Sequence, residues 1–173
     1  GADCCIAVMS GNFVQRGEPA VVNKYLRCAA AIEAGVNLCI ELPSYYAVSS
    51  AENFADGAVK LLNSLMCNYV VFGSECGDID ILINEPESYR TELKSLLSNG
   101  LSFPAARQTA LVNYITTFTS NSSKKTTTHL HDKSQQEIVS ALSSPNNILG
   151  IEYLKALKKY KSSIKPVCIS RFA

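Results

Sequence analysis

The sequence has no segment of the kind that crosses or targets a membrane. No apolar stretch reaches the roughly 18 residues that a membrane-spanning helix requires. The first residues also lack the charged and apolar regions of a signal peptide. We therefore expect a cytoplasmic protein without a membrane anchor.

The motifs of the common metal and nucleophile sites are absent as well. None of the seven cysteines forms a C-x-x-C pair, which argues against a zinc knuckle or a thioredoxin-like centre. Several cysteines lie in apolar runs, where Cys behaves as a small hydrophobe, and this usage fits a reducing cytosol. No Ser-His-Asp, Cys-His or paired-carboxylate arrangement stands out, so the catalytic residues are unknown from local chemistry.

No charge of one sign dominates the chain. It has 16 basic and 15 acidic residues, which excludes a strongly basic nucleic-acid module as the default. One local basic cluster is either a solvated helix face or a contact for RNA phosphates. Its members are Lys155, Lys158, Lys159, Lys161 and Lys165. His129 and His131 lie in a polar stretch without carboxylates or cysteines, and we expect surface histidines and no metal site.

The chain does contain an alternation of apolar runs and amphipathic segments. With 173 residues, 47% of them apolar, it suits a single domain over residues 1–173. The order strand, helix, strand, helix, strand predicts an α/β fold with a parallel sheet and right-handed crossovers, followed by added helices. The predicted strands cover residues 3–9, 37–42, 69–73 and 166–170. The predicted helices cover residues 22–34, 49–65, 86–98, 104–118, 135–142 and 144–159, with a polar loop at about 119–136.

Three of these helices have a clear apolar face. The first opens with Ser49 and Glu52, which have the spacing of a capping box. Its expected buried face is Phe54, Ala58, Leu61, Leu62 and Leu65. The faces of the next two helices are Tyr89, Leu93, Leu96 and Leu97, and then Leu111, Tyr114, Ile115 and Phe118.

The loop after the first strand is the strongest candidate for a ligand contact, because ligands of open α/β sheets bind beyond the carboxyl ends of the strands. Gly11 and Gly17 let backbone N–H groups approach an anion closely, and Arg16 has the fork geometry for a phosphate. The loop is not a Walker A motif, since no Lys-Ser/Thr follows the second glycine. Alternatively, its glycines serve turns in a surface loop. The candidate ligands here are Ser10, Gly11, Arg16 and Lys24.

Two later strand ends and one helix start add further candidates. Gly73 either lets a ligand pass over the backbone or forms a plain turn. Arg171 is either a phosphate contact or a solvated charge. Asn146 and Asn147 follow Pro145, where asparagine commonly caps a helix.

Several longer blocks of sequence resemble the tRNA(Met) cytidine acetate ligase family, and they occur in the family's order. The blocks are Val8–Ala20, Glu33–Leu38, Glu41–Pro43, Tyr46–Ala55, Val71–Glu75 and Pro145–Leu154. This family is similar to the nucleotidylyltransferases that carry an HxGH signature. The resemblance implies a Rossmann-like parallel sheet of that type.

The resemblance also implies an activity. Acetate would attack the α-phosphate of ATP, giving acetyl-adenylate and pyrophosphate, and the acetyl group would pass to N4 of the wobble cytidine in elongator tRNA(Met). Positioning and charge stabilisation would then suffice, without a protein nucleophile. Mg²⁺ is expected with ATP. The alternatives are a small-molecule adenylyltransferase of the same superfamily and a non-catalytic fragment that binds nucleotide or RNA.

The family's ATP-binding positions fall on Gly73, Asn146 and Arg171. Its HxGH signature would precede the first strand, and residues 1–173 do not contain it. We therefore expect a chain that is truncated at both ends and does not complete adenylation by itself.

Overall fold

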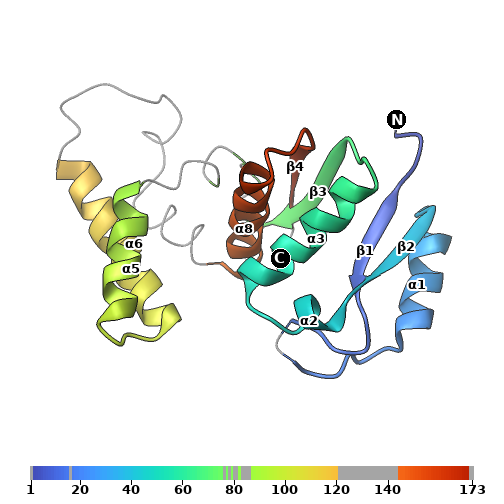
Figure 1. The fold of residues 1–173 in the computed structure, drawn as a ribbon, viewed down its shortest axis with the longest axis horizontal. Coiled ribbons are helices and arrows are strands. Elements are labelled where there is room, and N and C mark those ends of the chain that lie inside the picture. Colours follow the sequence, from blue (N-terminus) through green and yellow to red (C-terminus); the bar gives the residue numbers. More distant parts are fainter. Residues whose placement is uncertain are drawn as a thin grey trace. The chain divides into compact units, whose positions relative to one another are not determined.

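The computed structural model describes residues 2–15, 17–75, 77, 79, 82, 87–120 and 144–171. They fall into two compact units, one of Gly1–Val70 with Glu152–Pro166 and one of Val71–Ile151 with Val167–Ala173. Figure 1 shows the elements, which are β1 (Ile6–Ser10), α1 (Lys24–Glu33), β2 (Leu38–Leu42), α2 (Ser44–Ala47), α3 (Ala51–Ser64), β3 (Tyr69–Ser74), α5 (Glu87–Ser98), α6 (Phe103–Ser120), α8 (Pro145–Lys159) and β4 (Lys165–Ser170). The helix predicted at 135–142 and the two histidines lie outside the described residues.

The first unit is built on two parallel strands. β1 pairs with β2 from Ile6 opposite Leu38 to Ser10 opposite Leu42, so both carboxyl ends lie at one edge. The strand predicted from residue 3 begins only at Ile6, and the Cys5 N–H just before it donates to the Asn37 side chain (2.8 Å). The parallel α/β architecture predicted from the order of elements is thus confirmed.

Helix α3 packs on two sides in this unit. One cluster of buried side chains is Val59, Leu62, Val70, Ala156, Leu157 and Ile164, and a second is Leu42, Ala47 and Ala58. The predicted face was partly wrong, since Leu65 lies beyond the helix end and is 36% exposed, whereas Val59 is fully buried. The cause is contact with two clusters, which buries a wider stripe than one apolar face.

The capping box at the start of α3 was wrong by one residue. Ser50 is the cap, and its hydroxyl accepts from the Asn53 N–H at 3.4 Å. The Ser49 hydroxyl instead donates to the carbonyl of Tyr46 (2.8 Å), at the end of α2. The short helix α2, which the sequence did not indicate, therefore takes the serine that the pattern assigned to α3.

Strands β3 and β4 form a second two-stranded sheet among the described residues. The Lys165 N–H donates to the Asn68 carbonyl, and the Arg171 N–H donates to the Ser74 carbonyl, each at 2.9 Å. Residue numbers rise together along both strands, so this pair is also parallel. The end of β3 and the end of β4 consequently lie side by side, as the candidate site requires.

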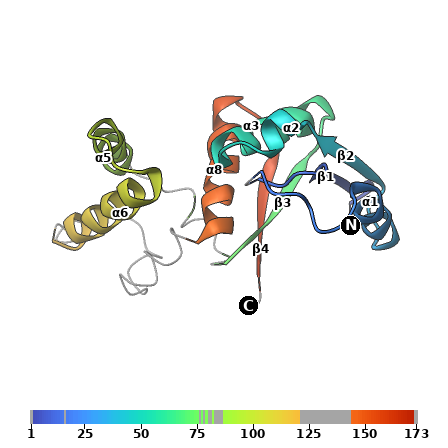
Figure 2. The same ribbon diagram turned by 90° about the horizontal axis from the view of Figure 1, so that it is seen from below.

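In the second unit, α5 and α6 pack against each other, as Figures 1 and 2 both show. Their contact is formed by the buried residues Tyr89, Ala110 and Leu111, with Leu93, Leu96 and Tyr114 around them. The faces predicted for these helices are confirmed at those positions, except that Leu97 is 37% exposed. The side chains of Ile115 and Phe118 are outside the described set.

Candidate functional site

Gly73 and Arg171 lie together where β3 and β4 end. A Cβ atom on Gly73 would meet both Cγ and Cδ of Arg171 at 3.0 Å. The aliphatic part of Arg171 therefore crosses the Gly73 backbone, and any side chain at position 73 would require the arginine to shift. Arg171 is exposed. Its stem is thus held at the strand end while its guanidinium remains available to an anion.

A buried polar contact connects the end of β3 to the first turn of α8. Ser74 and Asn147 are both fully buried. The Asn147 side-chain oxygen accepts from the Ser74 hydroxyl and from the Glu75 N–H, the latter at 2.9 Å. The interpretation of Asn147 as a helix cap is therefore wrong, because α8 already begins at Pro145 and the Asn147 side-chain oxygen binds Ser74 and Glu75.

The Glu75 carboxylate binds the start of α8. Its Oε1 accepts from the Asn146 side-chain amide (2.7 Å) and backbone N–H (3.3 Å), and its Oε2 accepts from the Asn147 N–H (3.0 Å). Asn146 is therefore not a cap either, because Glu75 from another segment satisfies the helix start. Burial raises the pKa of Glu75, but these hydrogen bonds outweigh burial and hold the pKa below its ordinary value.

The three positions Gly73, Asn146 and Arg171 thus come together in the second unit through neighbouring contacts. Gly73 touches Arg171 directly, and Glu75, two residues after Gly73, binds Asn146. From the sequence, Gly73 is a candidate at this strand end, whereas Glu75 has no predicted role. The sequence carried no signal for this pairing, because Glu75 and Asn146 are 71 residues apart in the chain.

The loop after β1, in the first unit, closes as a small hairpin. The Ala20 N–H donates to the Asn12 carbonyl and the Gly17 N–H to the Val14 carbonyl, at 2.9 and 2.8 Å. Gly17 has φ +74°, which accounts for a glycine at the turn. Arg16 lies outside the described residues. Gly17 therefore serves a turn, which was one of the two interpretations of the loop glycines. An anion contact at this loop stays a prediction.

Two charged residues that the sequence did not single out hold the start of this loop. A Cβ atom on Gly11 would collide with Oε1 of Glu41, so that carboxylate lies against the Gly11 backbone. Glu41 also pairs with Lys24 at 2.6 Å, and the hydrogen bond raises the pKa of Lys24. Arg27 donates to the Gly11 carbonyl and, at 3.0 Å, to that of Val22. Ser10 precedes Gly11 at the end of β1, so Ser10, Gly11 and Lys24 share this neighbourhood.

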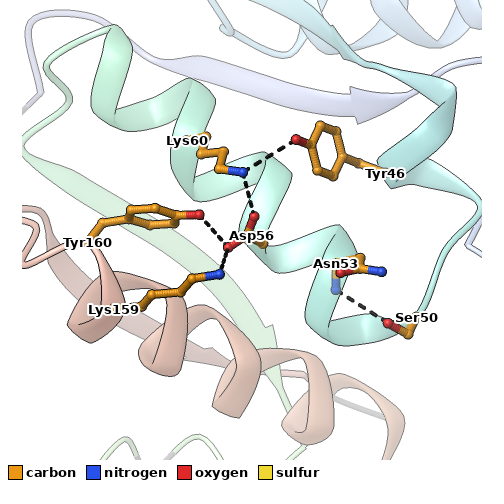
Figure 3. A network of polar contacts seen from close by, with 7 residues as sticks. All are labelled: Tyr46, Ser50, Asn53, Asp56, Lys60, Lys159 and Tyr160. Atoms are coloured by element: carbon orange, nitrogen blue, oxygen red, sulfur yellow. Dashed lines mark hydrogen bonds and ion pairs between the residues drawn. The ribbon is translucent and has the colours of Figure 1, made fainter.

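A separate polar network joins α3 to the end of α8 (Figure 3). The Asp56 carboxylate accepts from Lys60 (2.8 Å), Lys159 (2.8 Å) and the Tyr160 hydroxyl (2.5 Å). Burial raises the pKa of Asp56, but these three donors outweigh it and hold the pKa well below its usual range. Lys159 of the basic cluster is thus paired with an acid.

The rest of the basic cluster is divided between paired and exposed groups. Lys155 pairs with Glu152 at 2.9 Å, whereas Lys158, Lys161 and Lys165 are exposed. Part of the cluster therefore serves internal ion pairs. Contact with RNA phosphates stays a prediction for the exposed members.

Metal and membrane features were sought in the described part of the chain. No three His, Cys, Asp or Glu residues there are grouped so as to hold a metal ion. No helix within those ranges is both long and apolar enough to cross a membrane. Every described cysteine is free, including the neighbouring Cys4 and Cys5.

Comparison with known proteins gives consistent matches over the whole chain. A sequence model described as HIGH Nucleotidyl Transferase matches residues 1–173. A tRNA(Met) cytidine acetate ligase of Acetivibrio thermocellus is 51% identical over 179 residues, covering 99% of this chain and 39% of that relative. The ligase of the same name from Clostridium perfringens is 50% identical, covering 98% and 41%. The chain thus spans about two fifths of the length of these relatives.

Solved structures give the same result. The crystal structure of Thermotoga maritima TmcAL bound with alpha-thio ATP superimposes with a TM-score of 0.79 at 38% identity, covering 99% of this chain and 40% of that one. The apo structure of the same protein gives a TM-score of 0.77. The fold and the sequence blocks therefore point to one group of proteins.

Proposed function

This chain belongs to the HIGH nucleotidyl transferase family, and we propose that it is part of an ATP-dependent ligase that acetylates tRNA. A carboxylate oxygen of acetate attacks the α-phosphorus of ATP, the bond to the β-phosphate breaks, and pyrophosphate leaves. N4 of the wobble cytidine in elongator tRNA(Met) then attacks the acetyl carbon, and AMP leaves as the N4 proton is lost. The names of the similar ligases and the nucleotide in the Thermotoga structure support this proposal.

The observation that carries the proposal is the placement of Arg171 across Gly73. An exposed guanidinium, held by its stem at the carboxyl ends of two parallel strands, lies where α/β proteins bind ligands. In the proposed site Arg171 offsets phosphate charge, Gly73 lets the nucleotide lie against the backbone, and Asn146 hydrogen-bonds the nucleotide.

Ser10, Gly11 and Lys24 are additional candidates for ATP contacts, at the end of β1. They rest on weaker support, because Lys24 is already paired with Glu41. Mg²⁺ is proposed to arrive with ATP, since Mg²⁺ is commonly held by substrate phosphates and water with one or two carboxylates. The free cysteines fit a cytoplasmic setting.

Calorimetric titration with ATP tests the site in the protein at its full natural length. Arg171→Ala should weaken ATP binding by about tenfold or more, because a charge-assisted hydrogen bond contributes roughly 1.5–3 kcal/mol. Lys94→Ala, which removes one exposed positive charge from α5, is the matched control and should bind as the wild type does. Equal affinity of the Arg171 variant and the control would remove Arg171 from the site.

The substrates are tested separately with labelled acetate. Transfer of label to tRNA(Met), dependent on ATP, is the expected result. Acetate-independent pyrophosphate exchange with another small acid would favour the small-molecule adenylyltransferase. ATP binding without turnover of any acid would favour a non-catalytic role.

A further inference from the structure

The donor and the acceptor in the contact between Glu75 and Asn146 are fixed by chemistry. Oε1 of Glu75 lies 2.7 Å from the amide nitrogen of Asn146. A carboxylate only accepts hydrogen bonds, so the asparagine must turn its NH₂ group toward Glu75. Its Oδ1 atom then faces the opposite way. The partner thus decides an amide orientation that is otherwise open to a flip.

The carboxylate is itself fixed in place. Its second oxygen accepts from the Asn147 N–H at 3.0 Å, and that N–H belongs to a helix backbone. The backbone of Glu75 is anchored in turn, because its N–H donates to the buried side chain of Asn147 at 2.9 Å. Since Glu75 is held at both its main chain and its carboxylate, it fixes the orientation of the Asn146 side-chain amide.

We infer that Glu75 is a positioning residue that turns the Asn146 NH₂ group toward itself, so that the Oδ1 acceptor of Asn146 faces the nucleotide. This inference rests on the proposed role of Asn146 in binding ATP. The group that meets Asn146 is accordingly a hydrogen-bond donor. ATP offers two kinds of donor outside its phosphates, the 6-amino group of adenine and the ribose hydroxyls.

A glutamine at position 75 tests this polarity with almost no change in shape. Glu75→Gln brings one NH₂ group into the contact. Backbone N–H groups that cannot turn face both oxygens, from Asn147 at 3.0 Å and from Asn146 at 3.3 Å. The glutamine oxygen keeps the shorter of these contacts, and the glutamine NH₂ faces Asn146. The Asn146 amide then flips and offers its own NH₂ to a donor on the nucleotide. Two donors would oppose each other there.

The measurement is the binding of four nucleotides to the full-length protein. They are ATP, purine riboside triphosphate (which lacks the 6-amino group), 2′-deoxy-ATP and 3′-deoxy-ATP. One analogue should bind the wild type about fivefold to tenfold more weakly than ATP, as expected for one lost hydrogen bond, and this analogue identifies the donor. In Glu75→Gln the preference for ATP over that analogue should disappear.

A compensating double variant separates an effect on the orientation of the side chain at position 146 from an effect on protein stability. In Glu75→Gln with Asn146→Asp, the aspartate accepts from the glutamine NH₂ and again presents an oxygen to the nucleotide. The preference for ATP over the identified analogue should therefore return, with the net charge unchanged. A merely structural role for Glu75 would not restore selectivity in this way.

The outcomes distinguish this inference from the proposed site. If Asn146→Ala weakens ATP binding but Glu75→Gln keeps the wild-type selectivity, or the double variant fails to regain it, Glu75 does not set the polarity. The proposed ATP site would then stand without it. If Asn146→Ala and Arg171→Ala both bind ATP as the wild type does, the proposed site is wrong and this inference falls with it.

Discussion

Asp56 in the first unit and Glu75 in the second are both carboxylates that accept hydrogen bonds from α8, but their donors differ in kind. Asp56 accepts from two ammonium groups and a hydroxyl, whereas Glu75 accepts from amides alone. An ammonium group has only donors, so Asp56 imposes no choice on Lys60 or Lys159. An amide has a donor side and an acceptor side, so Glu75 selects one orientation. The Asp56 contacts hold α3 to the end of α8, whereas the Glu75 contact fixes which side of the Asn146 amide faces a ligand.

The largest effect that would test this contrast is on stability. Asp56→Ala leaves Lys60, Lys159 and the Tyr160 hydroxyl without their shared acceptor, and we expect a loss of about 2 kcal/mol in the free energy of unfolding. The value is kept modest because solvent screens the partly exposed lysines. Glu75→Gln should cost less, since the glutamine retains one oxygen for α8. Urea unfolding followed by circular dichroism compares the two, and a larger loss in the Glu75 variant would contradict the assignment.

The fold of the first unit was readable from the sequence because its signals are local. Gly35, with φ +104°, ends α1 as the pattern predicted, and short apolar runs marked β1 and β2. A local pattern could not decide which of the adjacent residues Ser49 and Ser50 caps α3. Either can cap a helix, and the choice depends on the Tyr46 carbonyl of α2, which only the folded chain places.

The two carboxylate contacts were beyond a local reading for a different reason. Apart from Lys60, four residues on, Asp56 meets partners 103 and 104 residues later in the chain, and Glu75 meets partners 71 and 72 residues later. No spacing rule connects such positions. A family resemblance did supply Gly73, Asn146 and Arg171, but it names residues without their partners. The role of Glu75 therefore depends on the fold, which brings the end of β3 to the first turn of α8.

A smaller effect concerns acid conditions. The folded pKa of Asp56 lies below its unfolded value of about 3.9, so its stabilising contribution is complete above about pH 5 and is lost as the pH falls. The difference in unfolding free energy between the wild type and Asp56→Asn should therefore shrink by up to about 1 kcal/mol between pH 5 and pH 3. Other carboxylates, including Glu75, titrate in both proteins and cancel in the difference. A constant difference over this range would show that Asp56 is not held ionised by its partners.

The smallest expected effect compares a neutral cap with the charged one. The Ser50 hydroxyl caps α3 at 3.4 Å, whereas the Glu75 carboxylate binds the first turn of α8 at 3.0 Å. Ser50→Ala should lower the free energy of unfolding by about 0.5–1 kcal/mol, and Ser49→Ala by less, because the helix loses a cap only in the first case. Added salt should leave the Ser50 effect unchanged, since no full charge is involved, but should reduce the cost of Glu75→Gln by screening the carboxylate at the helix start. Unfolding at low and high salt measures both responses, and equal salt dependence would mean that the charge of Glu75 contributes nothing to its hold on α8.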